Sequence, residues 1–264
     1  MVESKKSTKE KAAAARAAAE AEQRKRDRRI QIIGGAVIAV LVAGIIAVGV
    51  IGSRGGSDAS TGVVADAAVP TGTFTSGDNA WGIPVNTTAD VPVLSIWEDF
   101  GCPACATFEA RLGTDIQKLA ADGTVQLVYR TTTFIEKNYP QSPNPDSSTR
   151  AANAYGCAVD AGKGTEVHNI IFENQPPIEN EGDGWTDDQL LQFGKDGGIA
   201  GDAYTTYETC VKDVKYRQWT VNSYTVFRES SVPGTPAVFL NGTEVPTEAL
   251  ATIDALKKYI ADNK

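Results

Sequence analysis

The sequence predicts an α/β domain held outside a membrane by a single N-terminal transmembrane helix, and three observations support this prediction. A run of 23 uncharged, mostly apolar residues occupies positions 30–52. An apolar segment suited to a buried strand, 91–97, is followed by apolar residues at helical spacing. Near the C-terminus, 236–245 has the pattern of a β-hairpin around Asn241-Gly242, and an amphipathic helix that Thr247 can cap follows it.

The apolar run at 30–52 is long enough to cross a bilayer as a helix. At ~1.5 Å per residue, a helix of this length covers the ~30 Å hydrocarbon core. A cleaved signal peptide would have an apolar region of only about 7–15 residues with a small-residue cleavage site directly after it. Here the run is followed by SRGGSD. We therefore expect an uncleaved anchor, with cleavage near ADAAVP at 65–70 as the alternative.

The distribution of charge predicts the orientation of this anchor. Residues 1–29 carry ten Lys/Arg and five Asp/Glu, whereas the other 235 residues carry 15 and 28. Positive flanks of transmembrane helices stay in the cytoplasm. Residues 1–29 are therefore predicted to be a cytoplasmic basic segment, and the chain after the anchor is predicted to be extracytoplasmic. Topology control explains the basic run better than nucleic-acid binding, so we expect no nucleic-acid partner.

The segment after the anchor separates it from the folded part. Residues 53–80 are small and polar and lack apolar periodicity, as expected of a flexible linker. We find no internal repeat in the rest of the chain. Residues 81–264 are therefore predicted to form one domain.

All four cysteines, Cys102, Cys105, Cys157 and Cys210, follow the predicted anchor, in a compartment where thiols tend to form disulfides. A metal site built on cysteines would need two CxxC pairs, or Cys and His ligands at finger-like spacing. This chain has one such pair and a single histidine, His168. We therefore expect no metal, and we interpret His168, which lies in an amphipathic helical pattern, as structural.

The motif Cys102-Pro103-Ala104-Cys105 is predicted to begin a helix directly after a strand. This places Cys102 at the N-cap and Pro103 at the first helical position, where its missing N–H costs nothing. Free backbone N–H groups and the helix dipole then lower the pKa of Cys102 below its usual value of about 8.5, while Cys105 is more shielded. A structural disulfide would gain little from closing so small a loop. We therefore predict a redox-active pair.

These features resemble the thioredoxin superfamily and, more narrowly, its DsbA-like disulfide oxidoreductases, especially membrane-anchored members from actinobacteria. The resemblance rests on WEDFGCPAC at 97–105, on 147–175, on SSVPGTPAVFLNGTEV at 230–245 and on the closing helix at 247–260. It covers about residues 81–264. It implies a thioredoxin-like α/β fold with an inserted α-helical subdomain at about 140–231.

The resemblance also implies a substrate-binding loop. In the family, the proline before the hairpin is cis and lies against the CxxC disulfide, and the preceding residue exposes its backbone to substrate. These roles are expected of Pro236 and Thr235.

The proton acceptor for Cys105 is harder to place. Glu98 and Asp99 precede Cys102 by four and three residues and could influence its proton transfers. In thioredoxin-like proteins the buried acid lies further back on the strand, at a position occupied here by Ile96 or Ser95. The sequence departs from the family at this point, and Glu98 is the expected substitute for proton transfer.

The two remaining cysteines, Cys157 and Cys210, are predicted to form a structural disulfide. They lie 53 residues apart in the predicted insertion, and pairing them would stabilise the fold by an estimated ~4 kcal/mol through loop closure. A second redox relay is the alternative. Neither cysteine has a CxxC partner or an evident helix N-terminus, which favours the structural role.

The predicted function is that of an extracytoplasmic oxidoreductase that introduces disulfides into exported proteins. The Cys102–Cys105 pair carries the electrons, so no cofactor is expected. The resemblance implies cysteine-bearing exported proteins as substrates and a membrane reoxidising partner, such as a vitamin K epoxide reductase homologue. A reductase or isomerase of the same fold is one alternative, because Pro-Ala stands where strong oxidases often have Pro-His. A non-enzymatic surface adaptor with an acidic face is the other.

Overall fold

The computed structural model describes residues 62–138, 146–176 and 184–264. The predicted cytoplasmic segment 1–29 and the predicted anchor 30–52 lie outside these residues. Among the helices in the described part of the chain, none is long and apolar enough to cross a membrane.

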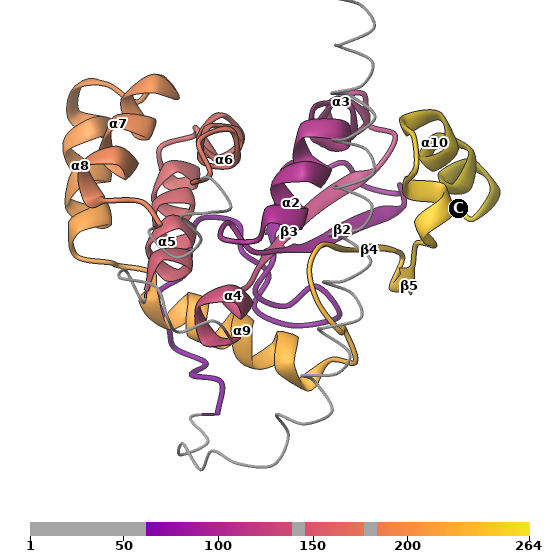
Figure 1. The fold of residues 1–264 in the computed structure, drawn as a ribbon, viewed down its shortest axis with the longest axis horizontal. Helices are drawn as coiled ribbons and strands as arrows, with labels where there is room; N and C mark the ends of the chain where they lie inside the picture. Colours follow the sequence, from indigo (N-terminus) through magenta and orange to yellow (C-terminus); the bar gives the residue numbers. More distant parts are fainter. Residues whose placement is uncertain (1–61, 139–145, 177–183) are drawn as a thin grey trace, which may run out of the picture. The chain divides into compact units, whose positions relative to one another are not determined.

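A five-stranded mixed sheet in the order β1-β3-β2-β4-β5 forms the centre of the domain (Figure 1). Its strands are β1 (Ile83–Pro84), β2 (Val93–Glu98), β3 (Gln126–Thr131), β4 (Ala237–Leu240) and β5 (Thr243–Glu244). The two central strands, β2 and β3, are parallel, and every other pair is antiparallel. β4 pairs with β2 with Ala237 opposite Trp97, which brings the chain before β4 close to the end of β2.

A helical run follows β2 and packs on one face of the sheet. It consists of α2 (Pro103–Phe108), a π-helical turn η1 (Glu109–Gly113) and α3 (Thr114–Ala121). The apolar residues that predict this helix, Phe108, Leu112, Ile116 and Leu119, are all buried in the main core. The π turn was not expected, because apolar spacing alone does not distinguish it from an α-helix.

Between β3 and β4 the described residues are mostly helical, which agrees with an inserted helical subdomain, although the helices begin before the predicted bound of about 140. This segment contains α4 (Phe134–Asn138), α5 (Ser147–Asp160), α6 (Gly164–Glu173), α7 (Asp187–Asp196), α8 (Gly201–Lys212) and α9 (Arg217–Glu229). Figure 1 shows α5 to α8 grouped beside the sheet and α9 running across it. Phe227 of α9 packs on Trp97 of β2 with ring centroids 5.3 Å apart. α9 therefore covers the face of the sheet opposite α2 and α3.

The prediction of a flexible linker over 53–80 was wrong for its second half. Residues from Val64 onward pack on the domain. The backbone N–H of Val64 donates to Asn222 Oδ1 at 3.0 Å, and the Asn222 amide donates back to the Val64 carbonyl at 2.8 Å. Thr71 donates to Asp160 through its N–H and its hydroxyl, and Pro70 is buried. The folded part therefore begins before Trp81. Polar contacts to distant helices hold this segment, and these leave no periodic pattern in the sequence.

The C-terminal hairpin has the predicted turn, and the last helix begins later than expected. Asn241 and Gly242 have φ of 50° and 82°, the left-handed backbone that a two-residue hairpin turn requires. Thr247 begins a 3-10 turn, η3 (Thr247–Leu250), instead of the helix. α10 (Ile253–Asp262) is capped by Thr252, whose hydroxyl accepts a hydrogen bond from the Ala255 N–H at 3.2 Å.

Candidate active site

The cysteine pair lies where β2 passes into α2. Cys102 is the N-cap residue, with an extended backbone at φ −87° and ψ 117°, and Pro103 is in the first turn of α2, as predicted. Both cysteines are free thiols. Cys102 is 6% exposed, which is less than expected, and Cys105 is fully buried. Solvent can therefore reach Cys102 but not Cys105.

The loop before β4 closes over Cys102. The Thr235-Pro236 peptide bond is cis, as the resemblance implies. The Cys102 thiol donates a hydrogen bond to the Thr235 carbonyl oxygen, with 3.4 Å between sulfur and oxygen, across 133 residues of sequence. The β2–β4 pairing explains this contact, because it places the residues that precede Ala237 beside the residues that follow Trp97.

The two thiols have opposite pKa shifts. A hydrogen bond from the Cys105 thiol lowers the pKa of Cys102 to about 7. Burial opposes this shift, and the side chain of Thr235 and the backbone of Cys105 and Ala104 support it. Burial and the neighbouring Cys102 sulfur raise the pKa of Cys105 well above its ordinary value. At neutral pH Cys102 is therefore partly ionised and slightly exposed, whereas Cys105 is a buried, protonated thiol, and thiol–disulfide exchange uses such a combination.

Asp99 is a fully buried acid beside this pair. Its carboxylate accepts hydrogen bonds from the Gly101 N–H at 2.7 Å, the Ser148 hydroxyl at 2.6 Å and the Ile135 N–H at 2.8 Å. The pKa of Asp99 is raised to about 7. Burial is the main cause and the charge of Cys102 adds to it, and together they outweigh the hydrogen bonds, which lower the pKa. Asp99 thus ties the active-site loop to the start of the helical insertion and titrates near neutral pH.

Gln175 is a site residue that the sequence analysis did not identify. Its side-chain amide donates to the carbonyl oxygens of Phe100 at 2.6 Å and Cys102 at 3.0 Å. It follows α6, so it fixes the active-site loop from the side of the insertion. A lone glutamine after a helix gives no sequence signal for this role.

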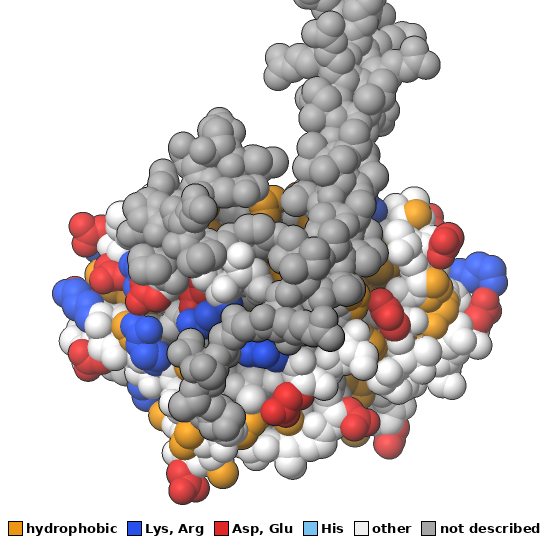
Figure 2. Space-filling model, turned by 60° about the horizontal axis from the view of Figure 1, so that its bottom comes forward, with side chains coloured by type: hydrophobic (Ala, Val, Ile, Leu, Met, Phe, Trp, Pro, Cys, Tyr) orange, Lys and Arg blue, Asp and Glu red, His pale blue; other side chains and the backbone are white. Residues whose placement is uncertain are grey.

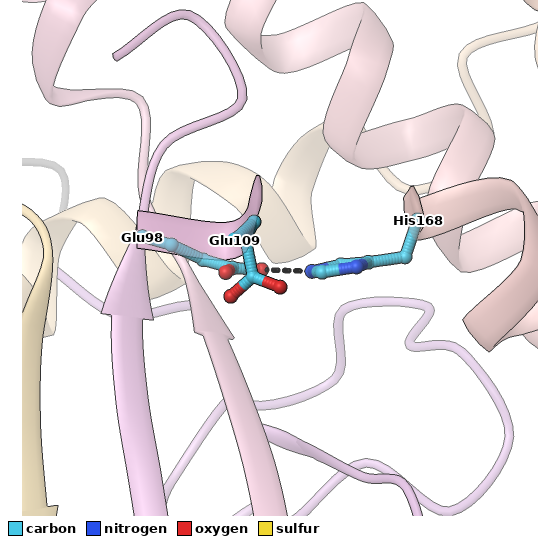
Figure 3. A group of neighbouring side chains, drawn as sticks. All are labelled: Glu98, Glu109 and His168. Carbon is cyan, nitrogen blue, oxygen red and sulfur yellow. Dashed lines mark hydrogen bonds and ion pairs between the residues drawn. The ribbon is translucent and has the colours of Figure 1, made fainter. Parts of the chain in front are cut away.

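Glu98, the expected proton-transfer residue, lies against His168 (Figure 3). Oε1 of Glu98 and Nε2 of His168 are hydrogen-bonded at 2.7 Å, and both side chains are buried. The His168 ring stacks on Tyr129 with centroids 4.1 Å apart. Burial lowers the pKa of His168, but the carboxylates of Glu98 and Glu109 raise it, to about 9. His168 is therefore a charged core residue, and proton transfer from Cys105 to Glu98 stays a prediction.

A family model described as thioredoxin matches residues 86–262. The chain belongs to the thioredoxin family. The match covers strands β2 to β5, the cysteine pair, the insertion and the cis-proline loop of this thioredoxin-family protein. No match was found among curated proteins.

Solved structures of disulfide oxidoreductases share this thioredoxin-family fold. One is "MdbA protein, a thiol-disulfide oxidoreductase from Actinomyces oris", with TM-score 0.58 and 21% identity, covering 77% of this chain and 96% of the other. Another is the reduced DsbG of Mycobacterium tuberculosis, with TM-score 0.54, 26% identity and coverage of 76% and 85%. A third is the reduced DsbA of the same organism, with TM-score 0.52, 23% identity and coverage of 69% and 99%.

The second cysteine pair of this thioredoxin-family protein is a disulfide, as predicted. Cys157 of α5 and Cys210 of α8 are joined with an S–S distance of 1.97 Å and a Cα–Cα distance of 5.9 Å. The bond links two helices of the insertion that are separated by 53 positions in the sequence. This disulfide involves neither Cys102 nor Cys105.

We expect alkylation of the reduced protein at Cys102 to reach half of its maximal rate near pH 7, because the thiolate reacts and its pKa is about 7. Because folding lowers the pKa of Cys102, its ionisation stabilises the folded state of the reduced protein at alkaline pH. This stabilisation is lost as the pH falls through about 7. The measurement is the iodoacetamide reaction rate against pH, followed by mass spectrometry of the Cys102 peptide. The urea-unfolded chain, with ordinary thiols, is the control, and the same midpoint in both states would contradict the prediction.

Proposed function

We propose that this protein is an extracytoplasmic thiol–disulfide oxidoreductase that introduces disulfides into exported proteins. The observation that carries the proposal is Cys102, the more exposed of the two thiols, with its pKa lowered to about 7, next to the fully buried Cys105 and under the Thr235-Pro236 loop. The MdbA and DsbG proteins that share the fold are described as thiol-disulfide and disulfide bond oxidoreductases, which supports the same class of reaction here.

The reaction begins with the oxidised enzyme. A substrate thiolate attacks Sγ of Cys102, the Cys102–Cys105 bond breaks, and Cys105 leaves with the electron pair and takes up a proton. A second substrate thiolate then attacks the substrate sulfur of the mixed disulfide, and Cys102 leaves as a thiolate. The substrate loses two electrons and the enzyme gains them. The hydrogen bonds that stabilise the Cys102 thiolate make it a good leaving group in this second step.

The loop at Thr235 supports a way of holding the substrate. The Thr235 carbonyl oxygen lies within hydrogen-bond distance of Cys102 Sγ. In the mixed disulfide that sulfur carries no proton, so the Thr235 backbone is available to the peptide segment next to the substrate cysteine. The cis-proline loop would then align the substrate for attack through backbone contacts that do not depend on its sequence.

The reduced enzyme must pass two electrons to an oxidant. We infer a quinone-linked membrane partner, of the type of a vitamin K epoxide reductase homologue, and an anchor at 30–52 that keeps the domain near it. The 23-residue apolar run and the positive charges before it support this arrangement. No cofactor is required in this scheme, since the cysteine pair carries the electrons.

The reduction potential of the Cys102–Cys105 pair distinguishes an oxidase from a reductase or isomerase. We expect a value well above the thioredoxin level of about −270 mV, because a stabilised Cys102 thiolate favours the reduced form. The measurement is equilibration of the full-length chain with glutathione buffers, with the two cysteine pairs quantified separately by alkylation and peptide mass. A value at or below the thioredoxin level would contradict the oxidase direction and make this protein an electron donor.

A further inference from the structure

Two glutamates and the only histidine of the chain converge between three elements of the fold. Glu98 ends β2, Glu109 lies in the π turn after the active-site helix, and His168 lies on α6. One ligand atom from each side chain lies within 4.8 Å of the others. Figure 3 shows the two carboxyl groups side by side at the edge of the imidazole ring. These three residues are called the Glu-Glu-His cluster below.

The hydrogen bonds among the described residues do not satisfy the cluster. Oε1 of Glu98 is bonded to His168, but Oε2 of Glu98 and Oε1 of Glu109 are buried without a partner. The Glu98 side chain is 1% exposed. Buried carboxylate oxygens without a partner are costly, and native proteins avoid them. Two carboxyl groups thus face one imidazole, only that of Glu98 is hydrogen-bonded to it, and one buried oxygen of each carboxyl group is left to bind a cation.

The backbone around Glu109 makes room for its carboxyl group. In the π turn, a Cβ atom on Gly113 would collide with Oε2 of Glu109, so the missing side chain lets the carboxyl group fold back toward the core. π turns occur frequently at functional sites. Glu109 is also only partly buried, which gives an ion or its water a path from the surface.

We propose that Glu98, Glu109 and His168 bind a divalent transition-metal ion of the Zn²⁺ class. One imidazole nitrogen and two carboxylate oxygens are donors that zinc accepts, and three protein ligands leave a fourth position for water. The ion would replace the proton on Nε2 of His168, which is released on binding. With bonds of about 2.0–2.2 Å, tetrahedral ligand atoms lie roughly 3.4 Å apart. On binding, the 2.7 Å distance between Glu98 Oε1 and His168 Nε2 would lengthen slightly. The other distances between ligand atoms, which are at most 4.8 Å, would shorten.

Such an ion would join β2, the active-site helix and the insertion behind the cysteine pair, without using a thiolate. This differs from the cysteine-based metal site that the sequence analysis rejected. The proposal does not depend on the proposed disulfide exchange at Cys102 and Cys105, because all three ligands lie outside the CPAC motif. It gives Glu98 the role of a metal ligand in place of the proton-transfer role predicted for it.

The test measures metal binding by the full-length chain, produced without a histidine tag and with both cysteine pairs oxidised so that no thiolate can bind. Co²⁺ is the probe, read by its visible absorption and by the shift of the imidazole proton resonances. Because the chain contains one histidine, these resonances belong to His168 alone. We expect one Co²⁺ per chain, displaced by Zn²⁺, with the His168 resonances shifted.

Two variants and a control locate the ion. Glu109→Gln removes a charged ligand, and Gly113→Ala leaves Glu109 intact but displaces its flexible carboxyl group from the cluster. Each is expected to weaken Co²⁺ binding at least about tenfold, because loss of a partner of a metal ligand already costs 10–100-fold. Glu229→Gln, at an exposed glutamate on α9, should bind like the wild type.

The results that would overturn the proposal are equally specific. A folded wild type that binds neither Co²⁺ nor Zn²⁺ would mean that the cluster holds a proton and not a metal ion. Binding that leaves the His168 resonances unchanged, or that is equal in the wild type, Glu109→Gln and Gly113→Ala, would place the ion elsewhere on the protein. Any of these results would leave the proposed oxidoreductase function untouched.

Discussion

Replacing Cys102 by serine is expected to reduce the transfer of disulfides to a reduced substrate to the uncatalysed rate. A serine hydroxyl cannot form the disulfide that the substrate attacks, and it replaces the thiolate whose pKa is lowered to about 7. The measurement is the loss of free thiols in a reduced, unfolded substrate protein after addition of the oxidised full-length enzyme. Activity close to that of the wild type would contradict the assignment of Cys102 as the exchanging residue.

Cys105→Ser is the matched variant for this experiment. It retains the Cys102 thiol but lacks Cys105, and it is given the oxidised form of the same substrate. The Cys102 thiolate attacks a substrate disulfide and releases one substrate thiolate, so a mixed disulfide that Cys105 can no longer displace is expected to accumulate. Non-reducing electrophoresis and peptide mass would locate that bond at Cys102. If Cys102→Ser instead preserves the protein's role in cells, the surface-adaptor alternative is supported and the enzymatic proposal fails.

Removing the disulfide between α5 and α8 is expected to lower the free energy of unfolding by about 4 kcal/mol, because closing a loop of this length restricts the unfolded chain. The variant is the double substitution Cys157→Ala and Cys210→Ala, which leaves no unpaired thiol in the insertion. Urea unfolding of the oxidised proteins, with and without the bond, measures the difference. The wild type under reducing conditions is a second comparison.

The same double variant tests the structural interpretation of this bond. Under conditions where the variant is folded, its rate of disulfide transfer should equal that of the wild type, because the bond is separate from the cysteine pair at α2. A folded variant that transfers disulfides much more slowly would favour the alternative, in which this pair relays electrons.

Features that depend on neighbouring residues could be predicted from the sequence. Pro103 after Cys102 predicts a helix start, because proline is suited to the first turn. Asn241-Gly242 predicts the hairpin turn, because both residues tolerate positive φ. The thioredoxin-like fold and the pairing of Cys157 with Cys210 also agree with the sequence analysis. The helix cap at Thr252 was missed, since Thr247 offers the same local signal.

The tertiary structure alone decided how these features meet. It set the hydrogen bond from Cys102 to the Thr235 carbonyl, in a loop that only the family resemblance had implied, buried Asp99, and placed Gln175 on the active-site loop. It also joined Glu98, Glu109 and His168 into one cluster and attached the segment before β1 to the helical insertion. Local pattern encodes backbone propensity and burial, whereas these contacts depend on the path of the chain between distant elements. The sequence by itself therefore predicted which residues we propose to exchange disulfides, and the fold determined the charges and contacts that surround them.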